Sequence, residues 1–209
     1  LGSVKMARNA EFQAVIPVRG KILNCLKADY DKIFKNEIIT DLIKVIGCGV
    51  EVKTGKNKEI SMFNLDNLRW NKIVICTDAD VDGFHIRTLI LTMLYRLVPT
   101  LIEKGYVYIA ESPLFEITTS DKTYFAKILK MIGNKKFDIQ RSKGLGENEA
   151  EMMSLTTMDP ATRRLIKIEP DDIEQTQWMF DMLLGDDLQG RKDFITNNGV
   201  DYLDMADIS

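Results

Sequence analysis

The sequence predicts an α/β protein with a mainly parallel sheet flanked by helices, followed by a mostly helical tail. Residues 72–76 form a β-branched apolar run, which is typical of a buried parallel strand. A long apolar segment of helical character, residues 86–104, comes next, and a second strand-like run covers residues 106–110. Strands that alternate with helices favour a parallel sheet. After residue 140, helix-start residues replace the strand pattern.

Three further features of the first half support this fold class. An apolar run over residues 12–18 predicts a first strand. Residues 30–46 carry apolar side chains at helical spacing, and Gly47 is expected to end that helix. Within residues 86–104, Pro99 is expected to kink or restart the helix, because proline lacks the N–H that a helix interior uses.

The second half is expected to contain a short antiparallel excursion and then helices. The expected elements are a hairpin over 115–125 with its turn at Ser120-Asp121, a strand over 137–140, helices that begin at Asn148 and Asp159, a helix whose acidic first turn is Pro170-Asp171-Asp172, and a helix over residues 188–196. Asn148 and Glu151 have capping-box spacing, and Asp159-Pro160 has the pattern of an N-cap before an N1 proline. We place a domain boundary near residue 118, which gives regions 1–118 and 119–209.

Charge is distributed unevenly along the chain. Residues 169–209 hold 11 acidic and 2 basic residues, a net charge of −9, whereas residues 1–168 hold 26 basic and 20 acidic residues, a net charge of +6. A polyanionic partner is therefore compatible with the first part only. Solvated surfaces explain the charges equally well.

Several classes of protein are disfavoured by composition. The chain has three cysteines without a Cys-x-x-Cys spacing, and a single histidine. These counts argue against a zinc ribbon, a disulfide framework and a multi-histidine metal site, and a reducing cytoplasm fits best. The longest apolar stretch, residues 89–98, is too short to span a bilayer.

The most informative segment is an acidic cluster directly after the strand at 72–76. Asp78, Asp80 and Asp82 lie within five residues. Alternate residues of an extended chain point the same way, so Asp78 and Asp80, with Asp82 as a third member, are expected to converge at the carboxyl end of the sheet. Crowded carboxylates repel one another unless a cation joins them. Mg²⁺ is the natural candidate, since it binds one or two carboxylates and keeps water and substrate phosphates as its other ligands.

Other interpretations of this cluster remain open or are rejected. In one alternative, Asp82 does no more than cap the following helix, and the other two carboxylates are solvated. A calcium loop is rejected, because Leu89 stands where an EF-hand needs glutamate and a strand precedes the cluster. A phosphatase of the haloacid-dehalogenase type also carries Asp-x-Asp after a strand, and Asp186-Asp187 could supply its later acidic pair.

Four motifs, taken in order, resemble the B subunit of bacterial type IIA DNA topoisomerases, the gyrase and topoisomerase IV family. The motifs are Gln13 to Asn24, Thr77 to Arg87, Lys143-Gly144-Leu145-Gly146-Glu147, and Thr156 to Pro160. They cover almost the whole chain. The resemblance implies a Toprim domain, with a Rossmann-like sheet, followed by the carboxy-terminal tail region of that subunit.

The resemblance also implies an activity, cofactors and partners. A type II topoisomerase cleaves, passes and rejoins double-stranded DNA with ATP, which binds in an amino-terminal domain that this sequence does not include. The B subunit joins an A subunit in an A₂B₂ assembly, and the A subunit supplies the attacking tyrosine. The metal is Mg²⁺, for which Mn²⁺ is a possible substitute, on Asp78, Asp80 and Asp82.

The resemblance assigns basic residues to DNA. Arg19, Lys21 and Lys143 become candidates for contacts to the DNA backbone, and quinolone-type inhibitors bind near Arg19 in the family. For Arg19 and Lys21 solvated loop charge is the alternative, and the glycines beside Lys143 could equally serve only a turn. His85 is expected to be a packed or hydrogen-bonded residue more than a catalyst, with at most a supporting role.

Two departures from the family pattern bear on activity. The family's acid/base glutamate lies in a Glu-Gly-Asp-Ser-Ala-Gly-Gly-Ser segment, and this sequence begins where that segment ends, so no catalytic residue is assigned to the chain. The stretch near Ala126 is also shorter than in relatives. We expect a protein of this sequence to cleave no DNA even with the partner subunit, and a religation-competent cleavage product would refute this. A non-catalytic DNA-binding or assembly module is the third class considered.

Overall fold

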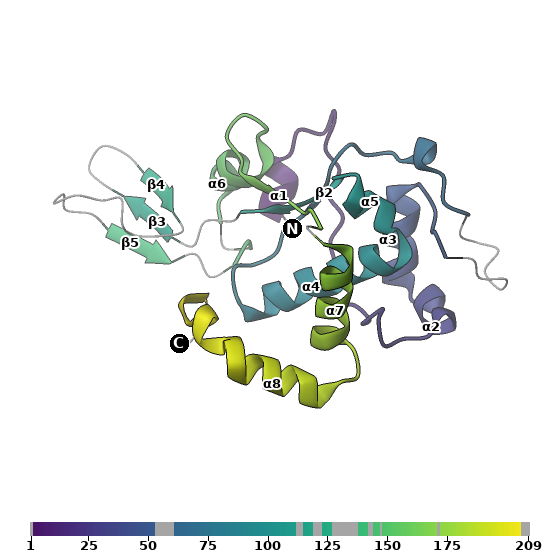
Figure 1. Ribbon diagram of the computed structural model, residues 1–209. Helices are drawn as coiled ribbons and strands as arrows, with labels where there is room; N and C mark the ends of the chain where they lie inside the picture. Colours follow the sequence, from purple (N-terminus) through teal and green to yellow (C-terminus); the bar gives the residue numbers. More distant parts are fainter. Residues whose placement is uncertain are drawn as a thin grey trace. The chain divides into compact units, whose positions relative to one another are not determined.

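The computed structural model describes residues 2–52, 61–111, 115–118, 123–126, 138–141, 144–146, 148–170 and 172–205. Its elements follow one another along the chain as labelled in Figure 1. They are α1 (Gly2–Ala7), α2 (Tyr30–Lys35), α3 (Glu37–Ile46), η1 (Leu65–Asn67), β1 (Ile73–Ile75), α4 (Val81–Leu97), α5 (Pro99–Glu103), β2 (Val107–Ala110), β3 (Phe115–Thr118), β4 (Thr123–Ala126), β5 (Asp138–Arg141), α6 (Ala150–Met153), η3 (Ser154–Met158), β6 (Leu165–Lys167), α7 (Ile173–Leu184), α8 (Leu188–Asn198) and η4 (Gly199–Met205).

The chain divides into two compact units, and each collects segments from distant parts of the sequence. Unit 1 contains residues 1–17, 74–87 and 108–167, and unit 2 contains residues 18–73, 88–107 and 168–209. The chain therefore passes between the units several times.

Unit 1 is built on a small mixed sheet whose strand order is β1-β2-β6. The sheet is only partly parallel, because β6 pairs with β2 in the antiparallel sense, with Ile109 opposite Ile166. The expected mainly parallel sheet is thus confirmed only as a mixed α/β arrangement followed by a helical tail. Helix α1 packs on α6 and η3. A second sheet, β4-β3-β5, is antiparallel throughout, as the hairpin pattern predicted.

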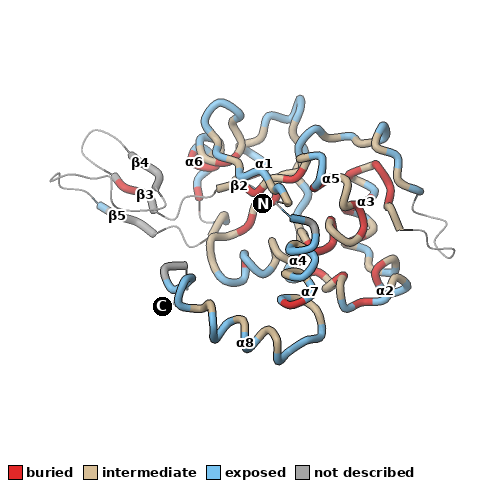
Figure 2. The backbone as a smooth tube through the Cα atoms, in the orientation of Figure 1, coloured by how far each residue is buried: buried red, intermediate tan, exposed pale blue. Residues whose placement is uncertain are grey.

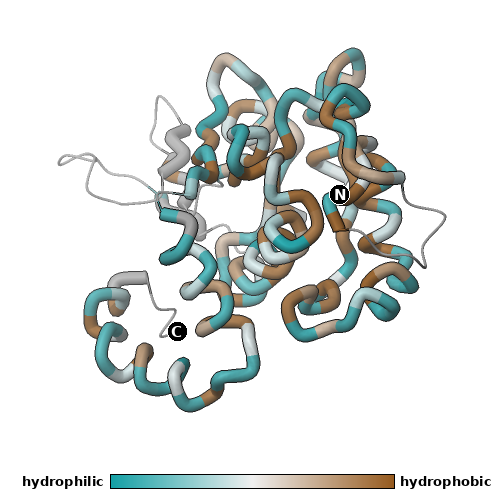
Figure 3. Tube along the Cα trace, turned by 45° about the vertical axis from the view of Figure 1, so that its right-hand side comes forward, coloured by the Kyte–Doolittle hydropathy of each residue, from teal (hydrophilic) through white to brown (hydrophobic). Residues whose placement is uncertain are grey.

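Unit 2 has a helical core. Helix α3 places Ile39, Leu42, Ile43 and Ile46 on one buried face, as its 3.6-residue apolar period requires. Helices α4 and α5, with Val98 between them, contribute further fully buried side chains, namely Met93, Leu94, Leu97, Val98 and Leu101. In Figure 2 α8 is drawn as intermediate or exposed throughout, in agreement with its lack of buried residues. Figure 3 shows that α8 is mainly hydrophilic with isolated apolar positions.

The predicted helix at 30–46 is two helices joined at Asn36. The Asn36 N–H donates to the Ile33 carbonyl and ends α2, while its side-chain oxygen accepts from Ile39 N at 3.2 Å and begins α3. Apolar spacing continues across this residue, so the pattern alone does not show the break. Pro99 restarts the helix as α5, which confirms the alternative offered for that residue.

Three other local predictions were wrong. Residues 12–18 form no strand, and Gln13 instead donates its side-chain amide to the Met158 carbonyl at 2.6 Å. Asp159 caps a turn by accepting from Ala161 N at 2.9 Å, and no helix follows. Glu149, without a side-chain bond, occupies the N-cap position of α6 that was assigned to Asn148. The Ser120-Asp121 turn lies outside the described residues.

The helix predicted to open with Pro170-Asp171-Asp172 is confirmed as α7, which begins at Ile173 with Asp172 as its N-cap residue. Its carboxylate accepts from Gln175 N at 2.9 Å, which satisfies one of the free N–H groups at the start of α7. All three cysteines are free thiols, and Cys25 and Cys48 are buried. Over the part of the chain that the structure describes, no helix is long and apolar enough to span a membrane.

Candidate metal centre

The acidic segment lies at the carboxyl end of β1, as the sequence predicted. Thr77 is buried and Asp78 and Asp80 are half-buried, so the chain leaves the sheet through a partly protected turn. The Asp80 carboxylate accepts from Gly83 N at 2.7 Å and its carbonyl accepts from Phe84 N at 2.9 Å. These bonds make Asp80, and not Asp82, the residue that caps α4.

Gly83 fixes the shape of this turn. A Cβ atom at residue 83 would overlap the Asp78 carbonyl oxygen and lie 2.8 Å from the Asp78 carbonyl carbon, whereas ordinary contact begins at 3.4 Å. Both opposing atoms belong to the backbone and have no side-chain rotation with which to move away. The close approach of α4 to Asp78 therefore requires glycine.

A loop from far along the chain holds the Asp78 carboxylate. Leu145 N donates to Asp78 Oδ1 at 2.7 Å, across 67 residues of sequence. A Cβ atom on Gly144 would lie 3.6 Å from the Asp78 carboxyl carbon and from both of its oxygens, so the Gly144 backbone runs directly beside the carboxylate. This contact was not predicted from the sequence, where the glycines beside Lys143 were assigned to DNA approach or to a turn. The family motifs give the order of these segments along the chain, but they do not show which segments are in contact.

Arg87 supports the same turn from α4. Its Nη2 donates to Thr77 Oγ1 at 3.2 Å, and its guanidinium lies 5.2 Å from the centre of the Phe84 ring. Burial lowers the pKa of Arg87, and the neighbouring Cys76 opposes that shift. Within the described part of the chain, the buried Arg87 Nε has no hydrogen-bond partner. The cation therefore depends on Thr77 and on the aromatic ring for its stabilisation.

The donor set of this turn fits a hard cation that retains most of its water. Asp78 and Asp80 offer carboxylate oxygens, each with one oxygen fixed by a backbone N–H. The residues that the structure describes contain no group of three or more acidic, histidine or cysteine side chains that could hold a metal. A closed protein cage for Ca²⁺ or Zn²⁺ is therefore not formed by these residues, whereas Mg²⁺ needs only one or two carboxylates.

The remaining candidate residues are Asp82, His85, Arg19, Lys21 and Lys143. Asp82 and His85 are exposed in the first turns of α4, so His85 is not a packed residue. Arg19 and Lys21 are exposed and belong to unit 2. Lys143 lies outside the described residues.

The acidic pair invoked for a phosphatase has other roles. Asp187 accepts from Gly190 N at 2.8 Å and caps α8, and Asp186 forms an ion pair with Lys27 at 3.1 Å. The pair follows the end of a helix, where a dehalogenase-type site needs the end of a buried strand.

Comparison with known families agrees with this geometry. Residues 1–112 match the Toprim domain, and residues 134–196 match the carboxyl terminus of the DNA gyrase B subunit. The chain belongs to the Toprim domain family.

The most informative relatives are gyrase subunits. The chain is 42% identical over 206 residues to the DNA gyrase B subunit of Thermotoga maritima, covering 95% of this chain and 31% of the relative. It is 44% identical over 204 residues to that of Mycoplasmoides gallisepticum, covering 94% and 30%. The corresponding protein of Streptococcus pyogenes serotype M3 is 41% identical over 213 residues, covering 95% and 31%. The chain thus spans about a third of the length of these relatives. The resemblance to the Toprim and tail region of a type IIA topoisomerase B subunit is confirmed.

Proposed function

We propose that this chain is the magnesium-binding and tail portion of a gyrase-like B subunit. The larger protein would cleave double-stranded DNA, pass a second duplex and religate the break, with ATP bound in another domain. A partner A subunit would complete an A₂B₂ assembly and supply the tyrosine that attacks the phosphodiester. Mg²⁺, or Mn²⁺ in its place, would be held by Asp78 and Asp80, with Asp82 as a third candidate ligand.

One observation carries the proposal. Asp78, from the acidic motif, accepts a hydrogen bond from Leu145 in the glycine-rich motif, at 2.7 Å. Two of the four motifs by which the chain resembles the family therefore meet at one carboxylate, although 67 residues separate them. A structural turn alone would not need the second motif.

The residues of the chain prepare the site in advance. Leu145 N and Gly83 N each fix one carboxylate oxygen, so the carboxylates lose little further freedom when a cation binds. Gly144 and Gly83 bring backbone next to Asp78 without side-chain bulk. A bound Mg²⁺ would supply charge stabilisation for the phosphate and its leaving oxygen.

The basic residues would hold the DNA backbone. Arg19 and Lys21 are exposed, and Gly20 between them has a φ of 71°, a conformation that favours glycine. Contacts of this kind position a duplex without reading its sequence. Lys143 and a quinolone site near Arg19 belong to the proposal through the family resemblance.

Metal binding by the chain alone tests the proposal without requiring catalysis. We expect Mn²⁺ titration followed by electron paramagnetic resonance to show at least a tenfold weaker affinity for Asp78→Asn and Asp80→Asn. Asp186→Asn removes one carboxylate of an exposed ion pair in the other unit and serves as the matched control. An Asp78→Asn protein with the parent affinity would rule out the metal assignment.

Activity tests belong to the larger protein. In the full-length B subunit with its A subunit, Asp78→Ala is expected to abolish Mg²⁺-dependent DNA cleavage. Survival of cleavage would show that Asp78 does not serve the metal. ATP-dependent negative supercoiling by the same complex would identify the gyrase branch of the family, and relaxation without supercoiling would identify topoisomerase IV.

A further inference from the structure

Loop 24–28 of unit 2 is fixed by a half-buried cation from α4, the guanidinium of Arg96. A single nitrogen of Arg96, Nη1, donates to the carbonyl oxygens of Leu26 and Ala28, each at 2.9 Å, and to that of Cys25. The Arg96 guanidinium also lies 4.6 Å from the centre of the Tyr30 ring. Three carbonyls directed at one cation define the path of this irregular segment.

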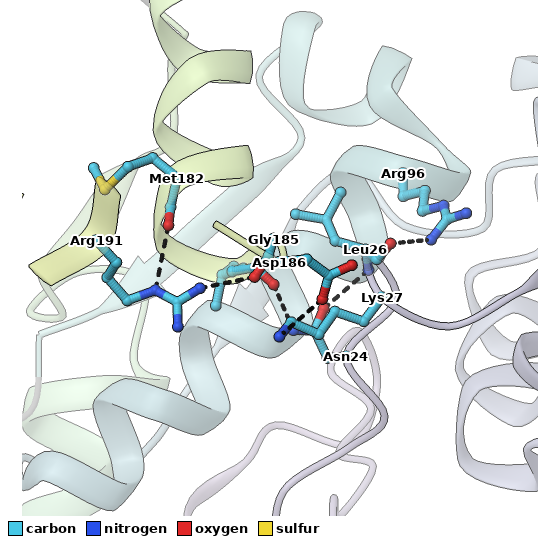
Figure 4. Close-up of polar contacts among 9 residues, drawn as sticks. Asn24, Leu26, Lys27, Arg96, Met182, Gly185, Asp186 and Arg191 are labelled. Carbon is cyan, nitrogen blue, oxygen red and sulfur yellow. Dashed lines mark hydrogen bonds and ion pairs between the residues drawn. The ribbon is translucent and has the colours of Figure 1, made fainter. Parts of the chain in front are cut away.

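The same loop is fixed on its other side by the carboxyl end of α7, as Figure 4 shows. Asn24 donates its side-chain amide to the Leu184 carbonyl at 3.0 Å and accepts from Leu26 N at 2.9 Å. A helix end leaves its last carbonyls without partners inside the helix. Asn24 therefore satisfies α7 and its own loop at the same time.

Arg191 completes the end of α7. It donates to the carbonyls of Met182 at 3.2 Å and Gly185 at 2.8 Å. The Lys27–Asp186 ion pair also joins the two segments, but its side chains are 46% and 89% exposed. Exposed ion pairs contribute little to stability. We therefore assign the connection between the loop and α7 to the hydrogen bond of Asn24.

The loop is continuous with the exposed basic segment, residues 19–21. Ile22, between them, is 5% exposed, and Cys25 within the loop is 0% exposed. The exposed basic segment therefore leads through buried Ile22 into a loop that Arg96 and the end of α7 hold.

We propose that Asn24 and Arg96 are positioning residues that fix the basic segment for DNA and couple it to the carboxy-terminal tail. This inference rests on the proposed function, because it takes Arg19 and Lys21 as DNA contacts. It adds that the tail governs the order of that segment through the end of α7.

The reactivity of the Cys25 thiol measures the order of the loop directly. In a Cys48→Ala, Cys76→Ala background Cys25 is the remaining thiol, and it is fully buried. Losing one hydrogen bond of ordinary strength corresponds to about a fivefold to tenfold change in a local opening equilibrium. We expect Asn24→Ala to raise the rate of reaction with a disulfide reagent by about that factor. Lys27→Ala, the matched exposed control, is expected to stay within about twofold.

Two comparisons separate positioning from a general loss of stability. Arg96→Met is expected to accelerate thiol reaction more than Arg96→Lys, because a lysine ammonium has three donors for the three carbonyls. Urea titration of each variant gives its global stability. The positioning role is wrong if the loss of global stability alone accounts for the faster reaction of the thiol. It is also wrong if the Arg96→Lys and Arg96→Met proteins react at the same rate.

DNA binding tests the coupling. Anisotropy of a labelled 30-base-pair duplex, titrated with the chain at 50 to 200 mM salt, is expected to show weaker binding and a salt slope reduced by about one for Arg19→Ala. Asn24→Ala should weaken binding in the same direction, and Arg19→Ala should then have a smaller further effect. If Arg19→Ala leaves affinity unchanged, the proposed DNA role of Arg19 fails and the coupling with it. If Arg19→Ala weakens binding but Asn24→Ala does not, the coupling alone is wrong.

Discussion

Replacing Gly83 by alanine tests the packing of the metal-binding turn. The new Cβ would overlap the Asp78 carbonyl oxygen and approach the Asp78 carbonyl carbon to 2.8 Å and nitrogen to 3.1 Å. Helix α4 must then move away from β1's end, and the bond from Gly83 N to Asp80 at 2.7 Å is weakened.

The expected change in the free energy of unfolding is the sum of two unfavourable contributions and one favourable contribution. Overpacking against backbone costs about 1–3 kcal/mol, and the lost hydrogen bond costs about 1 kcal/mol. Alanine gains about 1 kcal/mol of helix propensity over glycine. We expect a net loss of about 1–3 kcal/mol in the free energy of unfolding.

Gly190 is the matched control. It occupies the same position relative to its cap, because Gly190 N donates to Asp187 Oδ1 at 2.8 Å as Gly83 N does to Asp80. The three atoms nearest to a Cβ there all belong to the Asp187 side chain, with its carboxyl carbon at 2.9 Å, and a side chain can rotate away. Gly190→Ala is therefore expected to stay within about 1 kcal/mol of the parent.

The assay combines two readouts. Urea titration followed by far-ultraviolet circular dichroism compares the two variants, and hydrogen exchange of the Leu145 amide reports on its bond to Asp78. Gly83→Ala should lower the urea midpoint and expose the Leu145 amide to faster exchange. Equal midpoints for the two variants, with unchanged exchange at Leu145, would refute the packing argument.

Three further predictions address other contacts. Thr77→Val removes the oxygen that receives Arg87 Nη2 at 3.2 Å, and we expect a loss of about 1–3 kcal/mol by urea titration; an unchanged midpoint would show that Arg87 has another stabilising contact. Burial raises the pKa of Cys25 from 9.0 to about 11, so the folded state holds the thiol proton more tightly than the unfolded state does. This contribution to the free energy of unfolding is fully present below pH 9, and we expect up to about 2–3 kcal/mol of it to be lost between pH 9 and 11. A Cys25→Ala protein that loses the same amount over this range would contradict this prediction. Asp172→Ala removes the cap that accepts from Gln175 N, and thermal melting should show a loss of about 1 kcal/mol, whereas Asp172→Asn should lose less.

Local chemistry made part of the site predictable. The run before Asp78 is a strand and the residues after Asp80 are a helix, because β-branched residues and a capping aspartate act over a few residues. The alternative in which Asp82 caps the helix placed the cap two residues too late, since Asp80, which offers the same chemistry, has that role.

The wrong predictions depended on partners far along the chain. Residues 12–18 have a strand-like composition, but the structure gives them no neighbouring strand, and Gln13 binds the Met158 carbonyl instead. The short strand β6 was not predicted, because its own composition does not indicate a strand and its strand conformation depends on pairing with β2. The contact of Leu145 with Asp78 depends in the same way on tertiary structure.

The bond between Asn24 and Leu184 has a consequence for synthesis of the protein. The two residues are 160 positions apart. At translation speeds of 5–20 residues per second, roughly 8–32 seconds pass between their addition to the nascent chain. During that time loop 24–28 has been synthesised, but the Leu184 carbonyl that Asn24 binds has not yet been added to the chain. Quality-control factors would therefore meet loop 24–28 without its α7 partner throughout that interval, and a chain released before Leu184 is added would never form this contact.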